Sequence, residues 1–432
     1  MRIAHRSEMI GSQIPIRCVL MRGGTSKAVF LRARDLPSDP ARRDAVILAL
    51  FGSPDPRQID GLGGADILTS KVAVIGPPTR PDADLDYTFG QVSIREPVVD
   101  YDINCGNISA AVGVYAVEEG LVHVREPVTP VRVHNTNTGK VFVAHVPVQD
   151  GSPAIEGECV VEGVPGSGAE IVLDFTGTVG ASTGSLLPTG RVRDRLPVPA
   201  LGRTVEATIL DVANLCVFVT AADVGMTGQE GPAEFTPAHL QALVAVKEAA
   251  AHLVGLSPEG LVPLPVAVAP PASFRTIAGE TVAADRIHLL ARMAGGRPPV
   301  LHKAYPGTAA ACTAVAVMMA GTVPAAVART PAADGTVVIG HPSGAMLARA
   351  RLRQGAGWVV EQAGYSRTAR RLMEGYAFVR AAVLAASPAR AWSSPGGAGE
   401  PEASPGEAVA GSEGEAFPST ETIRKFSSGE AG

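Results

Sequence analysis

Aromatic residues are scarce in this chain, at 4% of 432 residues, and only two of them are tryptophan. Because large rings contribute so little, the core has to be built from Ala, Val, Leu and Ile, within a hydrophobic content of 46%. A chain of this length exceeds one small core and indicates two domains. The 48 glycines and 35 prolines are typical of many strands and turns rather than long helices.

Cysteine and basic clusters are also rare. The cysteines are odd in number, widely spaced and without a CxxC pair: Cys18, Cys105, Cys159, Cys216 and Cys312. This pattern argues against a disulfide framework and a zinc site, so we expect reduced thiols, no metal and no cofactor. The net charge of −5, with mixed signs, does not resemble a nucleic-acid-binding surface.

The chain lacks a long, strongly apolar run. Its first residues, MRIAHRSEMIGSQIP, contain no apolar segment of the secretory type. The uncharged stretch Tyr305–Ala328 is mostly Ala, Thr and Val, with two prolines and two glycines, which is less apolar than a membrane span requires. We expect a buried helix and a turn there, and a cytoplasmic protein that binds neither membranes nor nucleic acid.

Composition and periodicity divide the chain into four segments. We expect a flexible lead-in over residues 1–13, an N-terminal domain over 14–195 and a C-terminal domain over 196–386. The Ser/Pro/Gly/Glu-rich tail over 387–432 cannot bury enough apolar surface to offset its chain entropy, so we expect it to be disordered.

Apolar spacing predicts both helices and strands. Predicted helices cover Asp35–Phe51, Ile108–Val117, Pro237–Leu256, Gly307–Ala320 and Ser366–Leu384. Predicted strands include Ile16–Leu20, Ala28–Leu31, Lys71–Ile75, Thr88–Ile94, a hairpin over Val131–Val148, Val262–Ala269, Arg286–Arg292 and Gly335–Gly340.

A faint repeat relates the two halves. With a shift of 201 residues, GNISAAVGVYAVEEGLV from Gly106 aligns with GTAAACTAVAVMMAGTV from Gly307, with five of seventeen positions identical. The match predicts a glycine-led buried helix in each half. Two such helices facing each other would direct two positive N-termini into one cleft.

Several turns combine glycine with Ser, Thr, Asn or His. They are RGGTSK (Arg22–Lys27), DGLGGADILTSK (Asp60–Lys71), NCGN (Asn104–Asn107), YPGT (Tyr305–Thr308) and GHPSG (Gly340–Gly344). Glycine lets backbone N–H groups approach a ligand, and the hydroxyls add donors, which suits a carboxylate or a phosphate. No turn has the P-loop or dinucleotide-binding spacing.

Lys71 and Cys105 are the candidate proton carriers. Lys71 is either a strand-edge lysine with its ammonium group in water or a buried group able to act as a general base. Cys105 is either a packed thiol or a reactive one at a helix N-terminus. A base, an acid and oxyanion donors together are sufficient for isomerisation or epimerisation next to a carboxylate.

The remaining polar candidates divide by context. His341 and, less strongly, His302 are candidates for hydrogen bonds to a substrate carboxylate, whereas we interpret His134 as structural. Asp211 and Asn214 either line a site or cap a turn, and we favour the turn.

The motifs quoted above, with MRGGTSKAVFL, DYTFGQVSI, VHNTNTGK, AYPGTAAA and IGHPSG, occur in an order that resembles the PrpF family, from about Ile14 to about Ala385. That family includes 2-methylaconitate cis-trans isomerase, 3-methylitaconate isomerase and 4-oxalomesaconate tautomerase. The resemblance implies an α+β, diaminopimelate epimerase-like fold with two similar domains, each a curved mixed sheet around a central helix. It also implies a cofactor-independent proton shift in an unsaturated di- or tricarboxylate.

The resemblance also implies site residues. Lys71 and Cys105 would flank the substrate, with the lysine favoured as the base. The expected substrate-binding residues are Thr25, Ser26, Ser70, Asn104, Gly106, Asn107, Gly307, Thr308, His341, Ser343 and Gly344.

Departures from the family pattern affect the substrate. The repeat partner of Cys105 is Pro306, which disfavours a two-thiol racemase, and Ile103 replaces a common glycine. The motifs favour 4-oxalomesaconate tautomerase, with 2-methylaconitate isomerase and a non-catalytic accessory protein of an aconitase-like enzyme as alternatives. The expected partner is a small polycarboxylate, and the sequence leaves a homodimer open.

Overall fold

The computed structural model describes residues 11–101, 105–296, 299–331, 333–355 and 357–385. The predicted tail over 387–432 and most of the predicted lead-in lie outside the described residues. The helices are α1 (Pro40–Phe51), α2 (Gly106–Glu118), α3 (Pro237–Leu253), α4 (Gly307–Met318), α5 (Val323–Val327) and α6 (Ala381–Ala385). No helix among the described residues is long and apolar enough to cross a membrane.

The first half of the chain, together with one strand from the far end of the sequence, forms one part of a large mixed sheet. Its strands are β1 (Gln13–Gly23), β2 (Ser26–Arg32), β3 (Lys71–Gly76), β4 (Leu85–Val92), β5 (Val99–Asp100), β6 (Val128–Asn135), β7 (Lys140–Gln149), β8 (Ser152–Pro153), β11 (Ile171–Asp174) and β23 (Ala369–Arg380). Neighbouring strands pair in the order β23-β1-β2-β3-β4-β6-β7-β11.

The second half forms the rest of the sheet. Its strands are β12 (Asp194–Val198), β13 (Arg203–Val212), β14 (Asn214–Thr220), β15 (Leu264–Ala269), β18 (Leu289–Gly295), β19 (Val300–Leu301), β20 (Thr336–His341), β21 (Gly344–Gln354) and β22 (Trp358–Arg367). They pair in the order β12-β13-β14-β15-β18-β20-β21-β22. Two small pairs, β9 (Cys159–Val160) with β10 (Ser167–Gly168) and β16 (Phe274–Arg275) with β17 (Thr281–Val282), lie outside this order.

The two halves repeat one strand pattern. From β1 to β11 the pairings run antiparallel, parallel, antiparallel, parallel, antiparallel and antiparallel. From β13 to β22 they run in the same sequence. The corresponding helices are α1 and α3, and α2 and α4. The predicted α+β fold of two similar sheets around buried helices is therefore confirmed, although the domain boundaries themselves stay a prediction.

The central helices α2 and α4 are buried almost all round. Every α2 residue from Ile108 to Val117 and every α4 residue from Gly307 to Val317 is buried. Small side chains make this possible, because Ala and Gly let the surrounding strands approach the helix closely. Both helices share one apolar cluster, whereas α1 and α3 pack in separate clusters.

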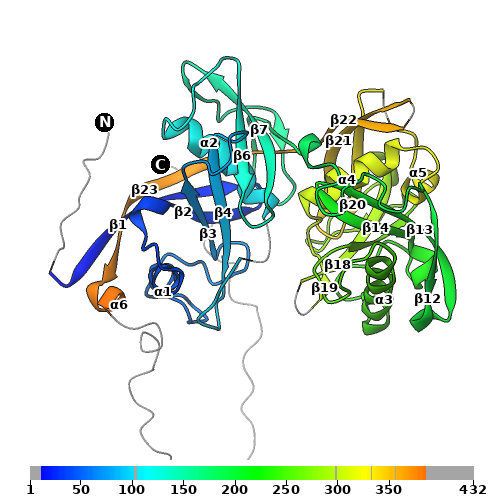
Figure 1. Ribbon diagram of the computed structural model, residues 1–432, viewed down its shortest axis with the longest axis horizontal. Helices are drawn as coiled ribbons and strands as arrows, with labels where there is room; N and C mark the ends of the chain where they lie inside the picture. Colours follow the sequence, from blue (N-terminus) through cyan, green and yellow to red (C-terminus); the bar gives the residue numbers. More distant parts are fainter. Residues whose placement is uncertain (1–10, 102–104, 297–298, 332, 356, 386–432) are drawn as a thin grey trace, which may run out of the picture. The chain divides into compact units, whose positions relative to one another are not determined.

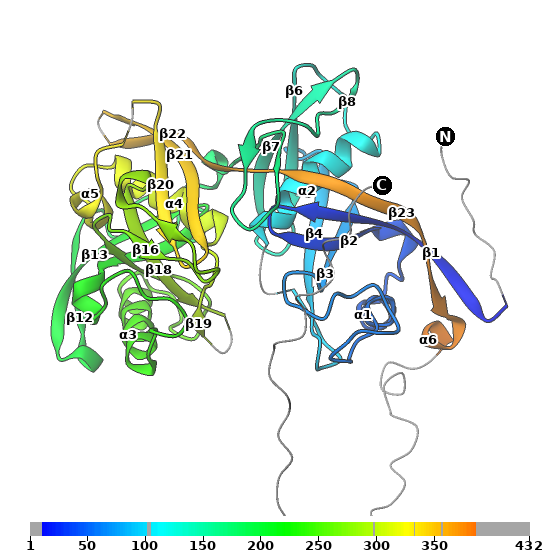
Figure 2. The ribbon, with the colours of Figure 1, turned by 180° about the vertical axis from the view of Figure 1, so that it is seen from behind.

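The last strand corrects the sequence-based prediction of a helix over Ser366–Leu384. This segment contains the end of β22, all of β23 and only a short terminal helix, α6. The strand β23 pairs with β1 along its whole length, and both views draw the orange β23 beside the blue β1 (Figures 1 and 2). The spacing of its charged residues is compatible with a helix or a strand. The segment forms a strand because it pairs with the edge of β1 that β2 does not occupy.

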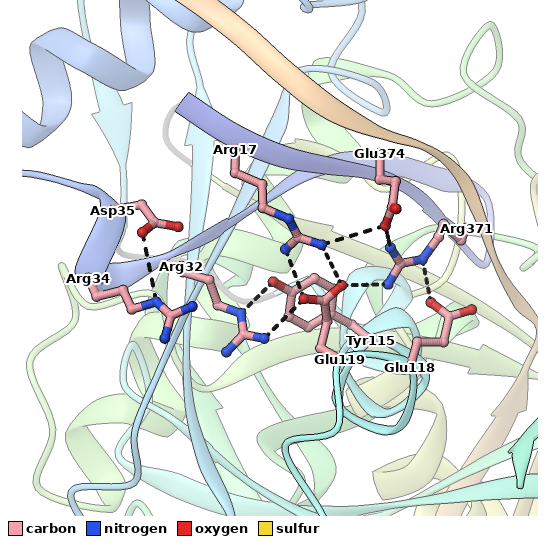
Figure 3. Close-up of polar contacts among 9 residues, drawn as sticks. All are labelled: Arg17, Arg32, Arg34, Asp35, Tyr115, Glu118, Glu119, Arg371 and Glu374. Carbon is pink, nitrogen blue, oxygen red and sulfur yellow. Dashed lines mark hydrogen bonds and ion pairs between the residues drawn. The ribbon is translucent and has the colours of Figure 1, made fainter. Parts of the chain in front are cut away.

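An ion-pair network joins β23 to the C-terminal end of α2 (Figure 3). Glu119 accepts hydrogen bonds from Arg17 at 2.8 and 3.0 Å, and from Arg32 and Arg371 at 3.0 and 2.9 Å. Arg371 also bonds the neighbouring Glu118 at 2.7 Å. Acidic residues oppose the negative end of a helix dipole. The three guanidinium groups offset that repulsion and connect three strands, β1, β2 and β23, to the helix.

We expect Glu119→Gln to lower the free energy of unfolding by roughly 2–3 kcal/mol at pH 7, because it leaves three partly buried cations short of a charge. The Glu119 side chain is only 9% exposed. Glu361→Gln is the matched control, because Glu361 pairs with Arg353 at 2.9 Å but is 39% exposed and should cost under about 1 kcal/mol. Urea unfolding followed by circular dichroism measures both, and equal costs would contradict the prediction.

The same network predicts a specific acid dependence. Hydrogen bonds from the three arginines outweigh burial and lower the pKa of Glu119 to about 2, from an ordinary value of 4.5. A lowered folded-state pKa stabilises the fold above about pH 4.5, and this contribution is lost as the pH falls toward 2. Unfolding curves of the wild type and Glu119→Gln should therefore converge as the pH falls from 4.5 to 2. A constant difference across that range would argue against it.

Candidate active site

Lys71 lies at the first position of β3, opposite Gln91 of β4. It is 7% exposed. Its Nζ donates a hydrogen bond to Gln91 Oε1 at 2.7 Å and lies 5.2 Å from the centre of the Phe89 ring. Of the two interpretations that the sequence left open, the structure supports the buried lysine.

Cys105 is the N-cap residue of α2 and is half-buried. Its thiol lies 3.9 Å from the hydroxyl oxygen of the buried Ser26. The strands β2 and β3 run parallel, and Ser26 and Lys71 are their first residues. The thiol, the hydroxyl and the lysine therefore belong to one edge of the sheet, next to the positive end of a helix.

The N-termini of α2 and α4 meet against one side chain, Tyr365 of β22; we call this contact the helix junction. A Cβ atom added to Gly106 would lie 2.3 Å from the Tyr365 hydroxyl oxygen and 3.9 Å from the Cα atom of Gly307. A Cβ added to Gly307 would lie 2.2 Å from Cζ of the same ring. Both glycines predicted from the repeat are thus required by close packing, and the two helix ends lie together as the repeat implied.

Asn107 connects the first turn of α2 to two other site residues. Its amide nitrogen donates to Thr25 Oγ1 at 3.0 Å, and its amide oxygen accepts from Arg367 Nε at 2.9 Å. Arg367 also donates to the Ser366 carbonyl and lies against Met346 Sδ, so its recorded partners are all neutral. A buried guanidinium without a carboxylate among them is a strong place for an anion.

A cavity of about 770 Å³, here called the larger cavity, lies beside the helix junction. Four predicted residues line it, together with Arg367: Thr25, Asn107, His341 and Ser343. Residues from both halves of the chain therefore contribute to one cavity. It is large enough for a small polycarboxylate.

His341 is a neutral hydrogen-bond donor in this cavity. Burial, and secondarily the charges of Arg367 and Arg292, lower its pKa to about 3. Its Nδ1 accepts from the Ser343 backbone N–H at 3.2 Å, which assigns the ring proton to Nε2. The Ser343 hydroxyl donates to a backbone carbonyl at 2.5 Å. Gly344 follows with a φ of +144°, which glycine tolerates.

Two predicted residues, Ser70 and Thr308, have other surroundings. The Ser70 hydroxyl donates to the Val92 carbonyl and accepts from Gln58, each within 2.9 Å, so it is already engaged within the protein. Thr308 lines a second, smaller cavity rather than the larger one. Asn104 lies outside the described residues, as does Ile103. Their proposed roles stay predictions.

Sequence reasoning missed Tyr365 and Arg367. Arg367 falls in the segment Ser366–Leu384 that periodicity assigned to a helix, and Tyr365 directly precedes that segment. The end of β22 is buried over Ala363–Arg367 and so lacks the alternation that identifies a half-exposed strand. The charged residues that follow this buried stretch made the segment resemble an amphipathic helix, although it forms the strand β23.

Two halves with the same strand order, each around a buried helix, define a protein of the diaminopimelate epimerase-like class. The chain belongs to the PrpF family: residues 13–380 match the family described as PrpF protein.

Relatives of this chain carry isomerase or tautomerase names. It is 46% identical over 386 residues to 3-methylitaconate isomerase of Eubacterium barkeri, which covers 87% of this chain and 100% of the relative. It is 39% identical over 370 residues to 4-oxalomesaconate tautomerase of Pseudomonas putida, covering 84% and 96%. A crystal structure of methylitaconate-delta-isomerase superposes with a TM-score of 0.78 at 45% identity, covering 89% of this chain and 100% of that one. The chain is therefore an isomerase.

The helix junction predicts an asymmetric response to alanine. Gly106→Ala should clash mainly with the Tyr365 hydroxyl, because the next ring atom is 3.2 Å away, whereas Gly307→Ala should clash with three ring carbons at 2.2–2.7 Å. Each change should cost roughly 1–3 kcal/mol or more. Tyr365→Phe should therefore restore much of the stability lost in Gly106→Ala and little of that lost in Gly307→Ala.

Thermal unfolding of the single and double variants measures this coupling. Tyr365→Phe alone is the control, and it should be close to neutral because the buried hydroxyl has no hydrogen-bond partner among the described residues. Equal rescue of both glycine variants would show that the ring is not the obstacle.

Proposed function

We propose that this protein catalyses a cofactor-independent 1,3-proton shift in an unsaturated di- or tricarboxylate. The observation that carries the proposal is the grouping of Lys71, Cys105 and Ser26 at one sheet edge beside the helix junction. Family membership supports the same reaction class.

The proposed reaction needs a base, an acid and donors for an oxyanion. The base removes a proton from the carbon next to the C=C bond, and the electron pair spreads over three carbons and onto the adjacent carboxylate. A proton added at the far carbon of that unit completes the shift. Positive helix ends and Arg367 favour the extra negative charge of this intermediate.

We assign the role of base to Lys71 and a proton-carrying or orienting role to Cys105. The side-chain nitrogen of Lys71 donates a hydrogen bond to Gln91 Oε1, which supports its orientation. Cys105 is the N-cap residue of α2 and so lies next to the positive end of the helix dipole. Asn107 and Arg367 are proposed to hold one carboxylate, and His341 to donate from Nε2.

The first substrate to test is 3-methylitaconate, because the isomerase of that acid is 46% identical, compared with 39% for the 4-oxalomesaconate tautomerase. The motif DGLGGADILTSK favours 4-oxalomesaconate and makes it the second candidate. A third acid, 2-methyl-trans-aconitate, completes the set.

Proton exchange in D₂O followed by NMR tests the proposal. The purified chain should introduce deuterium into one of the three acids while isomerising it. Lys71→Ala should lower that rate by roughly 10²- to 10⁴-fold, the usual contribution of a general base, with an unchanged circular dichroism spectrum. Wild-type exchange rates in this variant would remove Lys71 from the mechanism.

Cys105→Ser separates the two roles left for the thiol. A modest loss of rate is expected if the thiol only orients the substrate, and a loss comparable to that of Lys71→Ala is expected if it carries the second proton. Absence of exchange with all three acids, from a folded wild-type protein, would contradict the proposed reaction on these substrates and favour an accessory binding role.

A further inference from the structure

The smaller cavity, of about 430 Å³, shares no lining residue with the larger one. It contains the start of α4, because Pro306 and Thr308 line it, and Gly307 between them packs against Tyr365. It therefore reaches the same helix end that faces Gly106 and the neighbouring Cys105.

Polar residues of this cavity come from both halves. The described residues that line it include one lysine, one histidine and several hydroxyl or amide side chains, but no aspartate or glutamate: Lys140, His302, Asn135, Asn214, Thr138, Ser182 and Thr308. A concave, cation-containing surface without lining carboxylates is suited to an anion.

The hydrogen bonds leave donors available to a ligand. Asn214 Nδ2 donates to Thr308 Oγ1 at 2.8 Å, so the Thr308 hydroxyl proton can point elsewhere. Thr308 belongs to the first turn of α4, where backbone N–H groups also lack helical partners. Asn214 is thus a site-lining residue of this cavity rather than only a turn residue.

Lys140 supplies the cavity's charge. It begins β7 at the end of the NTNTG turn, and its Nζ lies 3.3 Å from Ser182 Oγ. Burial lowers the pKa of its ammonium group, and the nearby Asp211 opposes that effect. However, Asp211 Oδ2 already accepts from the backbone N–H groups of Ser182 and Thr183, both at 2.7 Å. Among the described residues, Lys140 forms no ion pair with Asp211, whose second oxygen, Oδ1, is buried without a hydrogen-bond partner.

We propose that the smaller cavity binds one carboxylate of the substrate, through the Lys140 ammonium group, the Thr308 hydroxyl and the N-terminus of α4. This inference rests on the proposed function for the nature of the ligand. It adds Lys140 and Asn214 to the site and gives the hairpin of the first half a direct part in selecting polycarboxylates over monocarboxylates.

Calorimetric titration of the full chain with propane-1,2,3-tricarboxylate, a saturated acid that cannot isomerise, tests the inference. The dissociation constant should rise by about 10- to 100-fold in Lys140→Gln, the usual effect of losing a charge-assisted hydrogen bond. Lys140→Arg should retain most of the affinity. Lys247→Gln is the matched control, since Lys247 lies on α3, donates to the Pro258 carbonyl and does not line this cavity. The affinity of this variant should equal that of the wild type.

A second variant covers the case in which Lys140→Gln does not fold, because Lys140 also lies near Asp211. Thr308→Val keeps the side-chain shape, and it should weaken the same titration about 5-fold or more. Wild-type affinity in both Lys140→Gln and Thr308→Val would overturn the inference, as would a wild-type protein that does not bind the acid. A purely structural role for Lys140 predicts a lower melting temperature with unchanged affinity.

Kinetics separates this inference from the proposed function. In Lys140→Gln, KM for the true substrate should rise about 10-fold or more with little change in kcat. Lysine-dependent binding without turnover of any acid would retain the cavity as a carboxylate site and reject the proposed reaction. Normal turnover with an unchanged KM in Lys140→Gln would retain the proposed reaction and reject the smaller cavity as a carboxylate site.

Discussion

The close approach of two helix ends to one tyrosine ring is the constraint on which the site depends. Gly106 and Gly307 leave no room for a Cβ atom, so α2 and α4 begin at the helix junction and nowhere else. Two positive helix ends repel each other, and the buried Arg367 adds a full positive charge beside them. The fold therefore holds an unfavourable concentration of positive potential, which an anionic ligand relieves. The close packing that positions the two helix ends thus also creates the positive potential that favours an anion.

Duplication explains how the chain builds this junction. Each half repeats the same series of parallel and antiparallel pairings, with its central helix at the same point in the series. The outermost strand differs in origin. In the second half, β12 precedes β13 in sequence and pairs with it, whereas in the first half the partner of β1 is β23 from the end of the chain. The strands of the first half are therefore completed by a strand from the end of the chain.

The central part of this arrangement could be predicted from the sequence. The weak match between Gly106 and Gly307 predicted both helices and their proximity, because small residues all round a helix indicate complete burial and glycine marks a close approach. The burial of Lys71 was one of two open interpretations, since a lysine before an apolar strand has the same sequence whether its end is in water or not. Arg367 and Lys140 were not identified, because their importance depends on which groups lie next to them in space, and that is decided by tertiary packing.

Two arginines of one short segment, Arg367 and Arg371, bind residues at the two ends of helix α2. At the C-terminal end, Arg371 of β23 binds Glu118 and Glu119 and, with Arg17 and Arg32, neutralises the acidic end. At the N-terminal end, Arg367, four residues earlier, binds Asn107 and brings no carboxylate with it. The charges at one end are satisfied within the protein, whereas the charge of Arg367 at the other has only neutral hydrogen-bond partners among the described residues. Because three arginines fix the acidic end of α2, we expect the helix to keep its place at the junction without a ligand, which would preorganise the positive site.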